Sequence, residues 1–514
     1  MTLRSQPLTL FLLFAVTGLA QAASRSGAAA NAPAMVTLAP NHHATISIAL
    51  QFHSGAVDDP PGKAGLTYLT AQVMAEGGTR ALDSKQLLEA LFPMATGVNV
   101  RVDKELTTFF TTVHKDHLSK MIPILTDVVA HPRWDEKEFE RIRDAAVNDV
   151  EKRLREGDDE NLGKQALSEL LYRGHPYGRL TLGHVAELRA LTLADVKAQA
   201  ARVFTTDRLT IGVAGGYPKD LPRKLAAALA SLPAHGAPEV AIAQASPGKP
   251  RFVLVDKQTD STAISIGFPW KLSRLDPDFV AMTVARSAFG EHRQFNGRLM
   301  QRLRGARGLN YGDYAYLEHF EQAGYDAATA QTGRVRHQQD FTIWVRPVQN
   351  DNRLFALRAA LYELERSVST EPFSDGEVDA TKGFLEGYLL LFAQTDARRL
   401  GYALDDHFLG THDFLADWRN QLASVTTAQV NAAWKKWVQP QAAQIVMVTP
   451  GAAQLAKQIL AGAPSPMHYQ KDAQGQTPPK PPELLKADTQ IEKLPLGAHT
   501  PADIAIIPVA QMFR

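Results

Sequence analysis

The chain has 514 residues, of which 45% are hydrophobic and 21% charged, and its formal net charge is +1. These values are typical of a folded globular protein with two or three domains. A charge so close to zero predicts no electrostatic attraction to nucleic acid or to acidic membranes. The chain contains no cysteine, which excludes disulfides and thiol chemistry.

Residues 1–22 have the pattern of a secretory signal peptide. Arg4 supplies a positive charge, residues 8–19 are mainly apolar, and Ala20-Gln-Ala22 is a small-residue cleavage site. A retained anchor needs about 20 apolar residues, and this run is shorter. We therefore expect cleavage after Ala22 or Ala23, a flexible leader over residues 23–35, and a periplasmic protein that is not attached to the membrane.

The next elements have the order of a zinc-peptidase active site without its ligands. An apolar strand, a polar turn and a helix that ends at Gly77-Gly78 follow one another from residue 46. In the H-x-x-E-H motif, two His side chains bind zinc and the Glu serves as base. The corresponding residues here are Tyr68, Ala71 and Gln72. Since none of them replaces an imidazole or a carboxylate, we expect no metal in this chain.

Two parts of the sequence repeat at a constant distance. The helix start Leu191–Val196 matches Val425–Val430, and the strand that follows each helix matches as well, all at an offset of 234 residues. Earlier in each half, Ala44–Ile48 matches Thr262–Ile266 as an alternating strand before a long helix. The pattern predicts two copies of one α+β domain.

Composition sets the expected boundaries. A stretch rich in Pro, Gly and Ala predicts a linker over residues 232–251, between an N-terminal domain (36–231) and a C-terminal domain (252–462). Residues 463–514 form a Pro-rich tail that ends in the apolar segment Asp503–Phe513. That segment is either a docked strand or an exposed tail that binds a partner, and its apolar character favours the docked strand.

Several motifs resemble the insulinase/pitrilysin family of zinc peptidases, in particular its two-domain members that are similar to mitochondrial processing peptidase. The resemblance extends over residues 36–462 and includes Thr96–Val100, Glu105–Phe110, Gly174–Gly178, Gly297–Arg304 and Gly308–Tyr311. It implies two α+β domains, each a mainly antiparallel sheet covered by helices, that form a clam-shell. It also implies that Asp149 stands where the family has its third metal ligand, a Glu.

The resemblance implies a role for Arg304 and Tyr311. In the family, an Arg and a Tyr from the C-terminal domain hold the substrate carbonyl, and in divided enzymes one subunit carries the zinc while the other supplies this pair. A guanidinium and a phenol are suitable donors for charge that develops at a peptide carbonyl. The alternative interpretation is a solvated helix end at Arg302, Arg304 and Arg307, followed by ordinary strand tyrosines.

Histidines outside the motif are weaker candidates. His114 and His117 have metal-ligand spacing but no third ligand nearby, so a solvated pair is favoured. His42 and His43 lie in a turn and are interpreted in the same way. His175 belongs to a motif that is structural in the family, so packing is favoured for it.

Three functions remain open at this stage. The first is a non-catalytic subunit of a heteromeric periplasmic zinc peptidase, with zinc in a homologous partner and peptides as substrates. The second is an inert peptide-binding or scaffold protein with the same fold. The third is an independent peptidase with a rebuilt metal site, which is the weakest because no cluster of His and acidic residues replaces the lost motif.

Overall fold

The computed structural model describes residues 32–321 and 331–514. The expected signal peptide and most of the expected leader lie outside the described residues. Ala34–Thr37 form the first strand, so the prediction of a flexible leader is wrong for Ala34 and Met35.

The first half builds a five-stranded sheet in the order β1-β5-β2-β4-β3. Only β1 and β5 run parallel, so the sheet is mainly antiparallel, as predicted. The strands are β1 (Ala34–Thr37), β2 (Thr45–Phe52), β3 (Asn99–Val102), β4 (Thr107–His114) and β5 (Leu209–Gly215).

The second half repeats this sheet and adds one strand, giving the order β11-β6-β10-β7-β9-β8. Apart from β11, each strand has a counterpart at the same place and in the same direction. This confirms the duplicated α+β fold. The strands are β6 (Phe252–Asp256), β7 (Ser261–Trp270), β8 (Asn310–Tyr316), β9 (Gln339–Gln349), β10 (Gln444–Thr449) and β11 (Ile504–Pro508).

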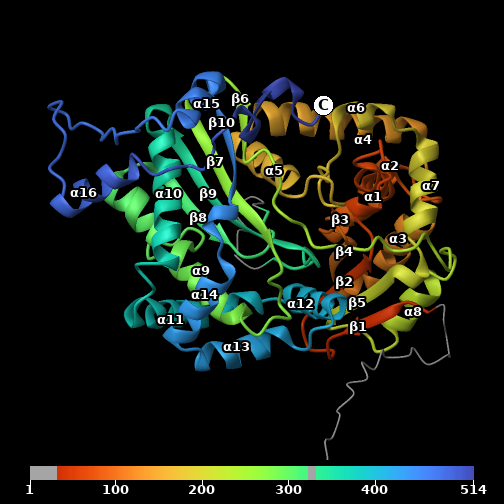
Figure 1. Ribbon diagram of the computed structural model, residues 1–514. Coiled ribbons are helices and arrows are strands. Elements are labelled where there is room, and N and C mark those ends of the chain that lie inside the picture. The colour runs from red at the N-terminus through yellow and green to blue at the C-terminus, as the bar shows by residue number, and fades with distance from the viewer. Residues whose placement is uncertain (1–31, 322–330) are drawn as a thin grey trace, which may run out of the picture.

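Helices cover both sheets, and the two halves lie side by side (Figure 1). In the first half they are α1 (Leu66–Glu76), α2 (Ser84–Leu91), α3 (Leu118–Ala130), α4 (Glu136–Asn148), α5 (Asp159–Leu171), α6 (Val185–Ala190), α7 (Leu193–Val203) and α8 (Leu221–Ala228). In the second half they are α9 (Phe279–Gly290), α10 (Arg353–Val368), α11 (Asp375–Phe392), α12 (Asp396–Leu409), α13 (Phe414–Ser424), α14 (Thr427–Trp437), α15 (Ala452–Leu460) and α16 (Pro482–Ile491). Two π-helical segments, η4 (Asp149–Glu156) and η6 (Met300–Gly305), occur in the described chain.

The 234-residue repeat is visible in the helix caps. Thr192 caps α7 and forms a capping box with Asp195, and Thr426 caps α14 and forms the same box with Gln429. These caps stabilise the start of each helix by satisfying its free N–H groups. Because the caps, helices and following strands correspond residue by residue, this part of the repeat was predicted correctly.

The earlier match is displaced by two residues. Ser47 of β2 pairs with Ala214, and Ala263 of β7 pairs with Val448, which is the repeat of Ala214 (214 + 234 = 448). The strand register therefore makes Ser47 equivalent to Ala263, an offset of 216 residues (263 − 47). The sequence match of Ala44 with Thr262 had given an offset of 218 residues (262 − 44). A shift of two residues leaves every side chain on the same face of the sheet, so the alternating pattern alone could not detect it.

The two halves exchange helices. α5 lies in the first half of the sequence but packs on β7 and β10, and α12 of the second half packs on β5 and β2 (Figure 1). Leu400 and Leu404 of α12 form a small core with Ala49 and Ala214 of the first sheet. The halves are therefore interlocked, which the linear domain boundaries did not predict.

Polar contacts also join the halves, and the pair of Arg336 and Asp103 is buried. Arg336 donates to both carboxylate oxygens of Asp103, with 2.9 Å from its Nε, and His337 Nδ1 lies 2.8 Å from a carboxylate oxygen of Glu105. The Tyr177 hydroxyl donates to the same Glu105. Glu105 and Tyr177 both come from the motifs that carried the family resemblance, and here they hold the second half against the first.

The expected linker has no regular secondary structure, whereas the tail contains a helix and a strand. No helix or strand occurs between residues 229 and 251, where the linker was expected. The tail contains α16, which the sequence did not predict, and Asp488 of this helix accepts from Arg307 at 2.8 Å. Residues 504–508 form β11 beside β6, so the apolar segment is a docked strand rather than an exposed tail.

Candidate functional site

A buried carboxylate fixes the start of α1, the helix that would carry the metal ligands. Asp59 accepts hydrogen bonds from the backbone N–H groups of Gly65 and Thr67 at 2.8 and 2.7 Å, and from the Thr67 hydroxyl at 2.6 Å. Burial raises the pKa of Asp59 to about 6, although these hydrogen bonds oppose the rise. The polar turn thus positions the helix.

The three motif positions on α1 do not share one environment. Ala71 is fully buried in the core between α1 and the first sheet. Tyr68 and Gln72 are half-buried, share a hydrogen bond, and lie on the side of α1 that faces Asp149. Burial and the charge of Asp149 raise the pKa of Tyr68 to about 12, so the phenol stays protonated at neutral pH. A neutral phenol and an amide occupy the places of two imidazoles.

Asp149 stands where the third ligand was expected but lacks the neighbours of a metal site. It begins the π-helical segment η4, and its carboxylate pairs with Arg153 at 3.5 Å. Within residues 32–321 and 331–514, no group of three or more His, Cys, Asp or Glu side chains is arranged to hold a metal ion. One carboxylate with a phenol and an amide does not make a zinc site.

Arg304 and Tyr311 lie together at the surface of the second half. Arg304 belongs to η6, Tyr311 is the second residue of β8, and the guanidinium carbon lies 4.6 Å from the centre of the Tyr311 ring. The same guanidinium carbon lies 4.8 Å from the centre of the Phe295 ring. Tyr311 and Phe295 are 70% and 61% exposed. The cation therefore makes cation–π contacts with two exposed rings.

Sequence reasoning missed Phe295. The residue lies in the turn after α9, where no periodic pattern or motif selects it, and an exposed aromatic residue by itself is an ordinary surface feature. Its significance comes only from its position over Arg304.

Neighbouring arginines are engaged in ion pairs, unlike Arg304. Arg298 binds Glu377 at 2.6 Å, Arg302 binds Glu371 at 2.5 Å, and Arg307 binds Asp488 at 2.8 Å. Among the residues that the structure describes, no carboxylate or hydrogen-bond acceptor contacts Arg304. The interpretation of these arginines as a solvated helix end is therefore wrong for Arg302 and Arg307, which form ion pairs with other elements of the fold. The N–H groups of Arg304 remain free to bind a group from outside the chain.

The structure does not bring this pair into contact with the vacated metal position. Tyr311 lines a hollow of 420 Å³ together with Gly157–Glu160, the residues that follow η4. Asp149 begins η4, whereas Gly157 follows its last residue, so the hollow lies at the other end of this segment from Asp149. Among the described residues, no hydrogen bond, ion pair or ring contact joins Arg304 or Tyr311 to Tyr68, Gln72 or Asp149.

A buried acid, Asp313, follows Tyr311 by two residues in β8. Asp313 is fully buried, accepts from Asn310, and has one carboxylate oxygen without a hydrogen-bond partner. Burial raises its pKa to about 8, while Asn310 and the charge of Arg304 act in the opposite direction.

We expect Asp313→Asn to stabilise the protein at high pH. Since the folded-state pKa of Asp313 lies above the value of about 3.9 in an unfolded chain, the folded state binds the proton more tightly. The contribution of Asp313 to the free energy of unfolding is therefore fully present below pH 4 and is lost as the pH rises toward 8. The neutral amide removes this loss, so the variant should exceed the wild type by about 1–3 kcal/mol at pH 8 and by less at pH 5. Urea unfolding at both values checks this, and a difference that does not change with pH would contradict it.

Other histidines serve as structural contacts or lie at the surface. His175 Nε2 bonds the carbonyl of Ala243 at 2.8 Å, as expected for a packing residue. The His43 side chain is 60% exposed, as expected, and its Nδ1 also lies 2.6 Å from Asp396 of α12, so it joins the two halves. His114 and His117 have ring centres 6.4 Å apart, and His114 pairs with Asp116.

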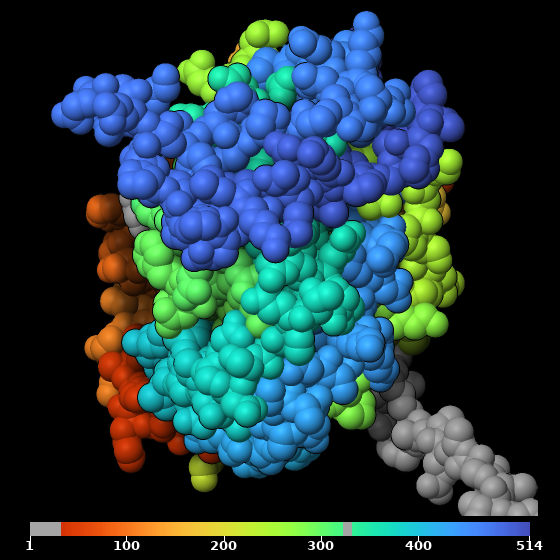
Figure 2. Space-filling model, turned by 60° about the vertical axis from the view of Figure 1, so that its left-hand side comes forward, coloured from red at the N-terminus to blue at the C-terminus, as the bar shows by residue number. Residues whose placement is uncertain are grey.

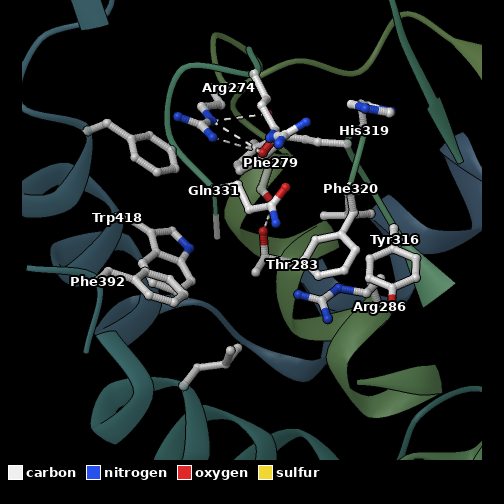
Figure 3. A pocket seen from close by; sticks show the side chains of 15 residues that line it. Arg274, Phe279, Thr283, Arg286, Tyr316, His319, Phe320, Gln331, Phe392 and Trp418 are labelled. Carbon is white, nitrogen blue, oxygen red and sulfur yellow. Dashed lines mark hydrogen bonds and ion pairs between the residues drawn. The ribbon is translucent and has the colours of Figure 1, made fainter. Parts of the chain in front are cut away.

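A separate pocket of 70 Å³ lies within the second half (Figure 3). Six of its fifteen lining residues are aromatic, and Arg274, which also lines it, binds Glu318 at 3.0 Å. None of the predicted site residues lines it. The aromatic residues of the wall are Phe279, Tyr316, Phe320, Phe392, Phe414 and Trp418.

In the described part of the chain, no helix is long and apolar enough to cross a membrane.

Comparison with known proteins agrees with this geometry. The model of the family described as "Insulinase (Peptidase family M16)" matches residues 35–184, and that described as "Peptidase M16 inactive domain" matches residues 190–383. The "Non-peptidase homolog YmxG" of Helicobacter pylori is 24% identical over 386 residues, which cover 75% of this chain and 84% of that protein. The beta subunit of mitochondrial processing peptidase from Neurospora crassa is 26% identical over 230 residues, 43% of this chain and 46% of that protein.

Solved structures share the fold. The crystal structure of a peptidase M16 inactive domain from Pseudomonas fluorescens has a TM-score of 0.72 at 20% identity and covers 82% of this chain and 96% of its own. With two family models matched in sequence order, the duplicated fold in place, and Tyr68, Ala71 and Gln72 standing where the zinc box should be, this chain belongs to the insulinase family of peptidases, family M16, as a member without the metal-binding motif.

Proposed function

We propose that this protein is the non-catalytic subunit of a heteromeric periplasmic zinc peptidase, and that it presents Arg304 and Tyr311 to the zinc site of a homologous partner for the hydrolysis of peptides. The observation that carries the proposal is that the guanidinium of Arg304 has ring contacts but no ion-pair partner among the described residues. This guanidinium contacts two exposed rings and has no acceptor among the described residues, whereas the arginines beside it are paired.

The arrangement suits stabilisation of an oxyanion. A guanidinium that packs against two rings loses little freedom when it binds, and its N–H groups remain available. The Tyr311 hydroxyl adds a second donor on the same exposed surface. Donors fixed in this way stabilise the negative charge that develops on a peptide carbonyl as water attacks it. Since the two donors do not reach the vacated metal position of their own chain, they would act on another chain.

A second candidate function is an inert peptide-binding or scaffold protein. It is favoured by the interlocked halves and by the buried contact between Arg336 and Asp103, which suit a rigid body. The name of the H. pylori relative, a non-peptidase homolog, is compatible with both candidates. A peptidase with a rebuilt metal site has no support, because no metal-binding cluster occurs in residues 32–321 or 331–514.

We expect the mature protein alone to hold no stoichiometric zinc and to cleave no peptide. Tyr68, Ala71 and Gln72 supply neither the two imidazoles that bind zinc nor the base that activates water. Metal analysis of the purified chain after dialysis against zinc checks the first part. One tightly held zinc per chain, lost on Asp149→Ala, would show that a site has been rebuilt.

The partner provides the test of the proposed function. A homologous chain with an intact H-x-x-E-H box should co-purify with this protein, and the mixture should cleave unfolded peptides faster than the partner alone. A neighbouring reading frame that encodes such a chain is the first place to look. A scaffold, by contrast, would bind the peptide or the partner without changing the rate.

A further inference from the structure

Residues 504–513 lie across both halves of the molecule. β11 pairs in parallel with β6, with Ile504 opposite Phe252 and Pro508 opposite Asp256. The chain then leaves the sheet, and Met512 and Phe513 become buried, at 5% and 3% exposure. They belong to the hydrophobic cluster that includes α1, α4, α5, α6 and one face of the second sheet. Figure 1 shows the C-terminal end beside α6 and α4, and in Figure 2 the dark blue C-terminal segment runs over the upper part of the molecule.

Polar contacts fix the backbone of this segment at two points after the strand. Arg155 of η4 donates to the carbonyl of Ala510 at 3.0 Å and to that of Met512 at 3.5 Å. The backbone N–H of Val185 donates to the carbonyl of Phe513 at 2.9 Å. Strand pairing, backbone carbonyls bound at fixed spacing and a pocket for particular side chains are together the features of peptide recognition by strand addition.

We propose that the edge of β6, Arg155, the Val185 N–H and the apolar pocket between them form a peptide-binding groove, which this chain fills with its own residues 504–513. The ligand class is an extended apolar peptide. Its last bound residues are two adjacent large apolar side chains, which are Met512 and Phe513 in this chain. This inference goes beyond the proposed function, since it needs neither a zinc partner nor Arg304 and Tyr311.

The segment fills the groove because it is tethered to it. A short tether gives a local concentration on the order of millimolar, so a free peptide competes poorly. The strand itself is held on one side only: β11 has β6 as its single neighbour, and Ile506 is 43% exposed. Beyond this pairing and the packing of Ala505, Ile507 and Val509 on the cluster, the segment is anchored by Met512, Phe513 and the contacts of Arg155.

The occupied groove also positions η4. Arg155 belongs to this segment, and Asp149 begins it, so the docked residues hold the helix of the vacated metal position against the second sheet. Neither family model extends to this part of the chain, since the second ends at residue 383. The occupant, residues 504–513, therefore lies in a part of the chain that neither model matches, whereas Arg155 and β6 of the groove lie inside the matched ranges.

The test uses the full chain with Met512→Asp and Phe513→Asp together, and Gln511→Asp as the matched control, because Gln511 is exposed beside them. In the double variant, amide hydrogen exchange should become at least about tenfold faster in residues 149–156, 185–190 and 252–256, because their contacts with the segment are lost. The control should leave these rates unchanged.

A labelled peptide with the sequence of residues 499–514 tests the groove directly. It should bind the double variant, and the wild type about 100-fold more weakly because the tethered segment competes. Arg155→Met in the double variant should weaken peptide binding by about tenfold, since it removes charge-assisted hydrogen bonds.

A second design covers the case in which the double variant does not fold. A protease site inserted between the exposed residues His499 and Thr500 allows the segment to be cut after folding. The cut chain should then exchange its segment for the labelled peptide. A folded, cut chain that takes up no peptide, or a folded double variant with unchanged exchange rates, would overturn the proposal.

Discussion

In a complex with a zinc-bearing partner, Arg304→Ala is expected to lower the rate at saturating peptide by about 10- to 1000-fold while folding and assembly remain intact. Removal of one donor to an oxyanion costs on the order of 10²–10³ in rate in enclosed sites, and a partly exposed site with two donors loses less. The loss should appear in kcat and not only in KM, because such a donor acts most strongly in the transition state. Steady-state kinetics of the reconstituted complex measure it.

Three further variants make the result specific. Tyr311→Phe keeps the ring that stacks on Arg304 and removes only the hydroxyl, so it tests the second donor. Phe295→Ala removes the second ring that contacts Arg304 and should lower kcat by less than Arg304→Ala. Arg419→Ala is the matched control, since Arg419 is an exposed arginine of α13 in the same half. Unchanged kcat in both Arg304→Ala and Tyr311→Phe would leave the scaffold function as the better account.

Local and repeated signals made the fold predictable. Thr192 and Thr426 are helix caps that work through residues three positions later, so sequence spacing alone identifies both helices. Alternation likewise identified β2 and β7, but a two-residue displacement between them was invisible because the side-chain period of a strand is two.

The exchange of helices could not be predicted in this way. Nothing in the amphipathic pattern of α5 states which sheet it covers, and the same holds for α12. Gly163 of α5 is informative only in the structure, where a Cβ at that position would lie 3.2 Å from the hydroxyl of Ser265. The absence of a side chain lets the helix approach the second sheet closely.

The candidate site was predicted residue by residue only where a motif existed. Arg304 and Tyr311 were found through such a motif, and the structure shows that they are in contact. Ala71 was grouped with Tyr68 and Gln72 on one helix face, yet it packs into the core while the other two are half-buried, because a helix face of this width extends beyond the edge of the core. Phe295 had no motif and was missed.

The buried pair of Asp103 and Arg336 should have the largest effect on stability. Both side chains are nearly inaccessible, at 3% and 2% exposure, and they join the two halves. Arg336→Ala leaves the Asp103 carboxylate buried without a partner, which costs about 3–5 kcal/mol of unfolding free energy. The double variant Asp103→Ala/Arg336→Ala removes both charges and should lose much less than the sum of the single losses. Denaturant unfolding at pH 7 of the wild type and the three variants gives the interaction energy.

The pH dependence of that energy provides an independent check. Burial alone would raise the pKa of Asp103, but the charge and hydrogen bonds of Arg336 outweigh it and hold the pKa well below its usual range. For an acid whose pKa is lowered by folding, the stabilisation is fully present above the unfolded value of about 3.9 and is lost as the pH falls through the folded value. The difference between wild type and double variant should therefore stay constant from pH 5 to 8 and shrink below pH 4. A difference that instead shrinks between pH 5 and 8 would point to another titrating group, with His337 beside Glu105 as the first to replace.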